Sequence, residues 1–96
     1  MFARVRITSG VPEKVDDGIR HFRETVVASY ENVDGFKGAY LLVNRKSGKV
    51  MGITLWETEA HMQATGKTSE QLRAAGSQVV SGTTPPPDEY EVVVEP

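Results

Sequence analysis

Apolar and polar side chains alternate near the start of the chain, where Ala3, Val5 and Ile7 are separated by arginines. A period of two is typical of a strand with one buried face, so we predict a strand over residues 2–8. From residue 15 on, apolar side chains return every three or four positions. This period predicts a helix that begins at Pro12 and carries one apolar stripe. The stripe consists of Val15, Ile19, Phe22, Val26 and Tyr30.

Two runs rich in aromatic and β-branched residues follow, at 36–44 and 50–56. Such runs joined by a short glycine-containing loop predict an antiparallel hairpin. We expect the turn at 46–48, with Arg45 opposite Lys49. In that register Gly38 lies opposite Trp56 and leaves room for the indole.

The last third of the chain predicts a second helix and a fourth strand. Thr58 is a candidate N-cap for a helix that starts at Glu59 and is interrupted near Gly66. Three consecutive prolines place a loop at 82–87, and a strand follows at 90–95. The order βαββαβ predicts an α+β, ferredoxin-like sandwich with an antiparallel sheet. We expect one domain over residues 1–96.

Composition narrows the range of functions. Eleven lysines and arginines against 13 acidic residues give a net charge of −2, which disfavours nucleic-acid binding. Without cysteine, and with two histidines at no recognised spacing, no metal site is expected. No apolar run reaches the roughly 18 residues of a membrane span, and the first residues lack the apolar region of a signal peptide. We therefore expect a cytoplasmic protein with no membrane partner.

The two faces of the predicted sheet differ in character. The odd-numbered residues of the first three strands are apolar and are expected to lie under the helices. The opposite face is too apolar for water and too polar for a dry core, so we expect a second copy of the sheet to cover it. This predicts a homodimer that encloses a cavity. The face carries Phe2, Arg4, Arg6, Phe36, Tyr40, Leu42, Asn44, Val50, Thr54 and Trp56.

Two segments resemble a known family. Gly35-Phe36-Lys37-Gly38, together with Leu55-Trp56-Glu57-Thr58 before a helix, is similar to the antibiotic-biosynthesis monooxygenase-like family of dimeric α+β barrels. The resemblance implies a tryptophan on the third strand that lines a cavity for a polycyclic phenol, oxidised by dioxygen without metal or flavin. Trp56 matches that position, but Gly52 stands where an asparagine is expected. The haem-degrading branch implies a histidine late in the second helix, which this chain lacks.

Six residues form the predicted site. Trp56 and Arg6 are the expected catalytic residues, and the expected substrate-binding residues are Tyr40, Asn44, Thr54 and Phe36. The predicted function is a cofactor-independent, monooxygenase-like enzyme that binds a small aromatic or quinone-like compound. The alternative is a dimeric ligand-binding or accessory module of the same fold without catalysis.

Simpler roles for the charged candidates stay open. For Arg4 and Arg6 we favour salt bridges to Glu91 and Glu95 on the last strand over binding of an anionic or phenolate ligand. His21 follows Asp17 by four residues, and His61 follows Glu57 by four. This spacing predicts solvated local pairs on the helices rather than catalytic groups.

Overall fold

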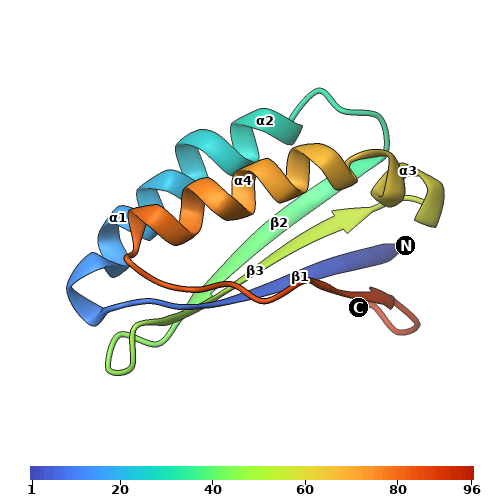
Figure 1. Cartoon of the computed structure of the whole chain (residues 1–96). Helices are drawn as coiled ribbons and strands as arrows, with labels where there is room; N and C mark the ends of the chain where they lie inside the picture. The colour runs from blue at the N-terminus through green and yellow to red at the C-terminus, as the bar shows by residue number, and fades with distance from the viewer.

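Four strands form one antiparallel sheet, and the helices pack against one of its faces (Figure 1). The computed structural model describes residues 1–96. The strand order β2-β3-β1-β4, with helices in the two crossover connections, is that of a ferredoxin-like α+β sandwich. The predicted fold class is therefore confirmed. The strands are β1 (Phe2–Ser9), β2 (Phe36–Val43), β3 (Lys49–Trp56) and β4 (Asp88–Glu91).

The first helical segment follows the predicted apolar stripe. It consists of η1 (Pro12–Lys14), α1 (Val15–His21), η2 (Phe22–Val27) and α2 (Ala28–Tyr30). Val15 and Tyr30, at the two ends of the stripe, are buried. The middle part, η2, is a π-helix, a wider winding that is frequent at functional sites.

The second helical segment is broken, as the sequence predicts. It consists of α3 (Glu59–Ala64) and α4 (Gly66–Val79), with the break at Thr65. The Thr58 hydroxyl caps α3 by accepting a hydrogen bond of 3.1 Å from the backbone N–H of His61. No helix of the chain is long and apolar enough to cross a membrane.

The turn between β2 and β3 is one residue longer than predicted. The Asn44 N–H donates to the Lys49 carbonyl at 2.8 Å, so four residues, 45–48, form the turn. The prediction placed Arg45 opposite Lys49 and is wrong. Because side chains alternate along a strand, this slip of one residue moves each side chain of β2 to the other face relative to β3. The observed pairs are Val43 with Val50, Leu41 with Gly52 and Ala39 with Thr54.

A β-bulge changes the register again at the start of β2. Phe36 pairs with Trp56, and Gly38 pairs with Leu55. The φ of Gly38 is +140°, a conformation that favours glycine. The prediction that Gly38 makes room for the indole of Trp56 is therefore wrong, and Gly38 instead permits the bulge.

The even-numbered side chains of β1 and β3 lie under the chain's own helices, which corrects the predicted assignment of faces. Arg4, Thr54 and Trp56 are all buried there. The sequence predicted Arg4 and Arg6 on the face away from the helices, but Met62, Thr65 and Ser69 of the second helical segment supply hydrogen-bond partners for them beneath the helices. The predicted enclosure of these side chains between two sheets is therefore wrong.

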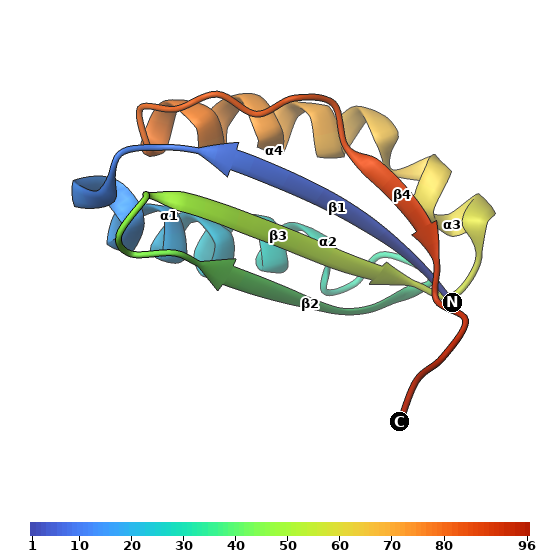
Figure 2. The ribbon, with the colours of Figure 1, turned by 90° about the horizontal axis from the view of Figure 1, so that it is seen from below.

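The other side of the sheet, seen from below in Figure 2, is covered by no element of the chain. We call it the open face. The register gives it an apolar surface, from which Tyr40 and Leu42 project with 63% and 52% exposure. The open face carries Ala3, Val5, Ile7, Tyr40, Leu42, Met51, Ile53 and Leu55, with Tyr90 and Asp88 of β4 at its edge.

Trp56 is the centre of the core at one end of the sandwich. Its side chain is fully buried, with the Tyr30 ring edge-on at 5.1 Å and the Phe36 ring at 5.4 Å. The indole Nε1 donates to the Thr54 hydroxyl at 3.0 Å, so its one polar atom is satisfied. Met62 of α3 completes this buried cluster.

We predict that Trp56→Ala lowers the free energy of unfolding by about 3–5 kcal/mol, because it removes the central ring of this cluster. Trp56→Phe keeps a ring in place and loses the bond to Thr54, so its expected cost is about 1–2 kcal/mol. Urea unfolding followed by circular dichroism measures both. Equal effects of the two variants would contradict the packing described.

Candidate functional site

A cavity of about 100 Å³ lies inside the sandwich, between the sheet and the two helical segments. The apolar side chains that line it come from the sheet and from both helical segments. Those from the helices include Phe22, Val26 and Leu72. Its charged lining residues are Arg4, Arg6 and Arg73, and neither aspartate nor glutamate lines it. The cavity is thus a mostly apolar space in which every charge is positive.

Glycines in the walls of the cavity let neighbouring side chains pack closely. A Cβ on Gly52 would lie 3.1 Å from the Phe22 ring, so the bare strand lets this ring pack down on the sheet. Gly18 and Gly76, on the two helices, also line the cavity. A Cβ on Gly18 would lie 2.8 Å from Val80. The missing side chain therefore lets α1 pack closely against Val80, which directly follows α4.

Arg4 is held entirely by the protein. Its Nη2 donates to the Met62 carbonyl at 2.8 Å and its Nη1 to the Thr65 hydroxyl at 3.0 Å. Its Nε lies 3.4 Å from a Glu89 carboxylate oxygen. The predicted partners were Glu91 and Glu95, but β4 pairs Glu89 with Arg4 and ends at Glu91. Arg4 therefore ties the end of α3 and β4 to β1, and has no guanidinium nitrogen left for a ligand.

Arg6 is only partly held. Its Nε and Nη2 both donate to the Ser69 hydroxyl, at 3.2 and 2.9 Å. Glu70 lies 3.6 Å from Nη2, but it also binds Arg73 and its side chain is 58% exposed. Nη1 is buried and finds no acceptor in the chain. Burial lowers the pKa of Arg6, although the neighbouring Glu70 opposes this shift. Arg6 thus presents a cationic donor that the protein leaves unpaired.

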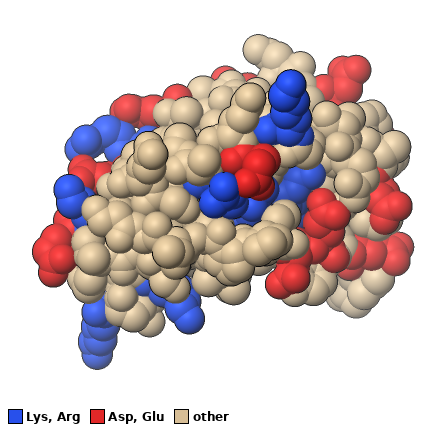
Figure 3. All heavy atoms as spheres, in the orientation of Figure 1, with Lys and Arg blue, Asp and Glu red and all other residues tan.

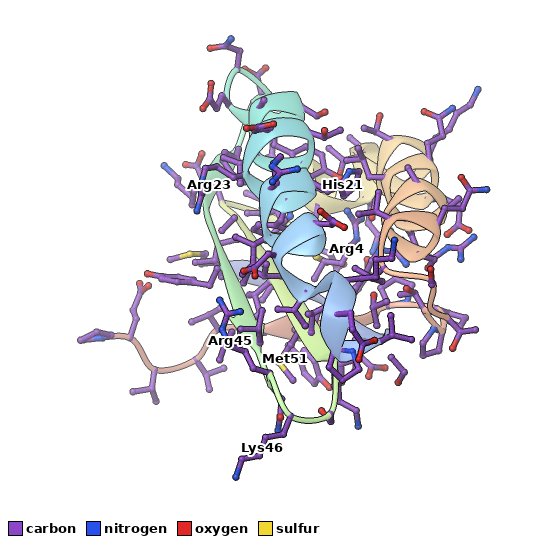
Figure 4. All side chains as sticks on the ribbon, turned by 90° about the vertical axis from the view of Figure 1, so that its left-hand side faces the viewer. Arg4, His21, Arg23, Arg45, Lys46 and Met51 are labelled. Atoms are coloured by element: carbon purple, nitrogen blue, oxygen red, sulfur yellow. The ribbon has the colours of Figure 1, made fainter.

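His21 is not the solvated residue that the sequence predicts. Asp17 pairs with Arg20 at 3.8 Å, and His21 turns inward to line the cavity. Its ring lies against Gly76 of α4, where an added Cβ would be 3.5 Å from Nε2. Nε2 is buried and has no partner in the chain. In Figure 4, His21 and Arg4 lie in the space between the two helical segments.

Tyr30 closes the cavity at the end near Trp56. Burial raises the pKa of its phenol above the ordinary value of 10.0, while Ser69, Arg4 and Arg6 act in the opposite direction. Burial thus favours the neutral form of the phenol, which has Ser69 and the two arginines as polar neighbours.

The structure brings only part of the predicted site together. Arg6 and Thr54 line the cavity, whereas Trp56 and Phe36 pack behind it in the aromatic cluster. Tyr40 projects from the open face. Asn44 directly precedes the hairpin turn, and its side chain accepts hydrogen bonds from the backbone of residues 46 and 47.

Sequence reasoning missed several residues of the cavity. Ser69 and Arg73 lie one helical turn apart on α4, a spacing that would have placed them on one face had α4 been predicted from Gly66. His21 directly precedes Phe22 of the apolar stripe, and the π-helix begins there. Within the described chain, no group of three or more acidic, histidine or cysteine side chains is placed to hold a metal ion.

The arrangement of Arg4 makes a prediction about stability. We expect Arg4→Lys to lower the free energy of unfolding by about 3–5 kcal/mol, because an ammonium cannot replace the buried fork of donors. The matched control Arg45→Lys breaks an exposed pair with Asp16 and is expected to cost about 0–1 kcal/mol. Urea unfolding measures the difference. A cost for Arg4→Lys no larger than that of the control would show that the network does not hold the fold.

The Tyr30 phenol predicts a pH dependence. Its pKa is raised in the folded state, so its contribution to stability is complete below the unfolded-state value of 10.0 and is lost as the pH rises through the folded-state pKa. Unfolding free energies of the native chain and of Tyr30→Phe, measured between about pH 9 and 11, should therefore show a steeper alkaline loss for the native chain. Parallel curves would contradict this.

Comparison with known proteins places the chain in a family. Residues 1–76 match the family described as antibiotic biosynthesis monooxygenase. The uncharacterized protein Rv2557 of Mycobacterium tuberculosis (strain H37Rv) is 32% identical over 92 residues. The match covers 96% of this chain and 41% of that relative, so the chain spans about two fifths of the relative's length.

Three solved structures share the fold. The monooxygenase ActVA-Orf6 of Streptomyces coelicolor, in complex with nanaomycin D, has a TM-score of 0.69 and 22% identity, covering 99% of this chain and 91% of its own. The cofactor-independent oxygenase SnoaB of Streptomyces nogalater has a TM-score of 0.69 and 17% identity, and the match covers 98% of this chain and 94% of that one. The heme-degrader MhuD of Mycobacterium tuberculosis, with two hemes bound, has a TM-score of 0.74 and 22% identity, and the match covers 99% of this chain and 98% of that one.

These structures, at under 25% identity, support the fold, and the family match itself covers most of the residues that form the cavity. The resemblance carried by the Gly-Phe-Lys-Gly and Leu-Trp-Glu-Thr segments is thereby confirmed. The chain belongs to the antibiotic biosynthesis monooxygenase family.

Proposed function

We propose that the protein is a monooxygenase-like enzyme that binds a small aromatic or quinone-like compound between its sheet and its helices. The observation that carries the proposal is the half-enclosed, mostly apolar cavity with the unpaired Nη1 of Arg6 inside it. Apolar walls with a few convergent polar groups are typical of small-molecule sites. Arg6 and Thr54 contact the ligand, whereas Trp56 acts as a positioning residue, because its indole holds the Thr54 hydroxyl.

The cavity supports a reaction that needs no reductant. A phenol that ionises beside Arg6 becomes electron-rich, since a nearby guanidinium favours the phenolate. The phenolate then reduces dioxygen directly: one oxygen atom becomes a carbonyl on the ring, the other leaves as water, and the substrate supplies four electrons and two hydrogens. The product is a quinone. Arg6 stabilises negative charge on the oxygens throughout.

Haem, the ligand of one structural neighbour, does not fit this cavity. The cavity is about 100 Å³ and open on one side, so its interior has room for roughly a single aromatic ring, and the rest of a larger ligand must extend through the opening. A four-pyrrole macrocycle would require the helices to separate from the sheet. An aromatic ring whose remainder extends through the open side of the cavity fits the observed volume better.

Binding without catalysis is the second candidate. The lining of the cavity favours it. Gly52, against which the Phe22 ring packs, offers no polar side chain to a substrate, and no carboxylate is present to act as a general base. A compound that does not ionise on its own would then bind without reacting. The oxygenation experiment below separates the two functions.

We also propose that a second copy of the chain covers the open face, with Tyr40 and Leu42 in the interface. A largely apolar sheet face of this kind marks an interaction surface, and self-association buries the same face on both copies. In this dimer Tyr40 contacts the second copy of the chain and does not line the cavity, in contrast to the substrate-binding role expected from the sequence. The single domain boundary of 1–96 and the cytoplasmic location remain predictions.

The dimer predicts the behaviour of two matched variants. The native chain should sediment as a dimer at micromolar concentration, and Leu42→Glu should sediment as a monomer, because a buried unpaired carboxylate opposes the contact. Gln71→Glu, on the exposed surface of α4, introduces the same charge and should leave the dimer intact. A monomeric native chain, or a dimeric Leu42→Glu variant, would contradict the interface.

The oxygenation is tested with 1-naphthol under ¹⁸O₂. The expected product is 1,4-naphthoquinone with one labelled oxygen, formed at least about 10-fold more slowly by Arg6→Ala, since a lost charge-stabilising donor costs a factor of this order or more. Arg45→Ala, in the exposed hairpin turn, should react like the native chain. Binding of 1-naphthol without labelled product would favour the non-catalytic alternative.

A further inference from the structure

The charges around the cavity are unbalanced in a way that the proposed function does not explain by itself. Three arginines line it with no carboxylate, and two buried side-chain nitrogens, Arg6 Nη1 and His21 Nε2, lack a partner in the chain. These are the only two such atoms in the whole protein. Buried polar groups are nearly always hydrogen-bonded, and leaving one unpaired costs about 1–3 kcal/mol.

The protein pairs its other buried groups thoroughly, so these two exceptions are informative. Arg4, on the same strand and the same face, satisfies all three of its guanidinium nitrogens within the chain. The Trp56 indole is paired with the Thr54 hydroxyl. The two buried side-chain nitrogens without a partner both belong to residues that line the cavity.

The one acid paired with Arg6, Glu70, is exposed and shared with Arg73. Glu70 sits at the surface and is bound by Arg73 through two contacts of 2.6 and 2.7 Å, closer than its 3.6 Å approach to Arg6. Figure 3 shows basic side chains alongside α4 that surround a small acidic cluster on this face of the molecule. The interior end of Arg6 therefore keeps a cationic donor in a space of low polarity, where it favours an anion more strongly than it would in water.

His21 adds a second donor from the opposite wall. Its element, α1, faces α4 across the cavity, and the absence of a side chain at Gly76 leaves the ring against the backbone of α4. Arg6 enters from the sheet and His21 from the helical layer, so a ligand between them meets donors on two sides.

We propose that the cavity selects ionised aromatic acids, with Arg6 Nη1 binding the anionic oxygen and His21 Nε2 donating to a second oxygen of the same ligand. The inference rests on the proposed function and narrows it: the aromatic compound enters as an anion, and His21 is a binding residue. A carboxylate with its two oxygens, or a phenolate beside a carbonyl, satisfies both donors, and the aromatic body lies against Phe22, Val26 and Leu72.

The test compares the binding of 1-naphthoate with that of 1-naphthamide, a neutral probe of the same shape, by titration in heteronuclear NMR. The native chain should bind 1-naphthoate at least about 10-fold more tightly, because a hydrogen bond to a charged group contributes about 1.5–3 kcal/mol. Arg6→Gln should remove most of this preference.

Two variants of His21 isolate its contribution, and neither alters the network around Arg4. His21→Leu should weaken 1-naphthoate binding about 5- to 10-fold and leave 1-naphthamide within about 2-fold, as expected for one lost donor to an anion. His21→Gln retains an N–H donor near the position of Nε2 and should restore most of the affinity. Urea unfolding confirms that each variant is folded.

The outcomes separate this inference from the proposed function. Equal binding of the two probes would overturn the selection of anions and leave an aromatic site standing. An unchanged preference in His21→Leu would remove His21 from the site. Failure of both probes to bind the native chain would overturn this inference and the proposed function together.

Discussion

The burial of two arginines of β1 under the helices constrains the rest of the structure. A guanidinium taken out of water must be met by acceptors, and Arg4 meets three, from the end of α3, from Thr65 and from β4. This network fixes the end of the second helical segment against the sheet. Arg6, two residues further along, has only Ser69 and a shared Glu70. The same strand thus provides Arg4, which stabilises the fold, and Arg6, which keeps a donor that can bind a ligand.

The two faces of the sheet divide the functions of the molecule. Beneath the helices, glycines on β3 and on both helical segments line a cavity in which one nitrogen of Arg6 and one of His21 have no partner in the chain. On the open face, Tyr40 and Leu42 project from an apolar surface that no part of the chain covers. A ligand site inside one chain and a contact surface outside it are therefore compatible, since neither requires the residues of the other. Tyr40 and Trp56, expected to share one cavity, belong to different faces.

Periodicity predicted the elements and their order, because the strand and helix periods are strong over Ala3 to Ile7 and Val15 to Tyr30. It did not predict which side chains of the sheet face the helices. A turn of three residues and one of four are equally consistent with the Arg45 to Gly48 segment, and this single residue decides which side of β2 meets the helices. Sequence reasoning places the arginines of β1 on the face away from the helices, because their partners Met62 and Thr65 are distant in sequence. His21 was misassigned because its spacing from Asp17 said nothing about Gly76 on α4.

The most direct measurement of the central claim, that the ligand lies between sheet and helices of one chain, is the set of NMR contacts between bound 1-naphthoate and the protein's methyl groups. The account predicts nuclear Overhauser effects to Val26 and Leu72, which line the cavity. Contacts to Leu42 and Ile53 of the open face instead would place the ligand between two sheets and contradict it.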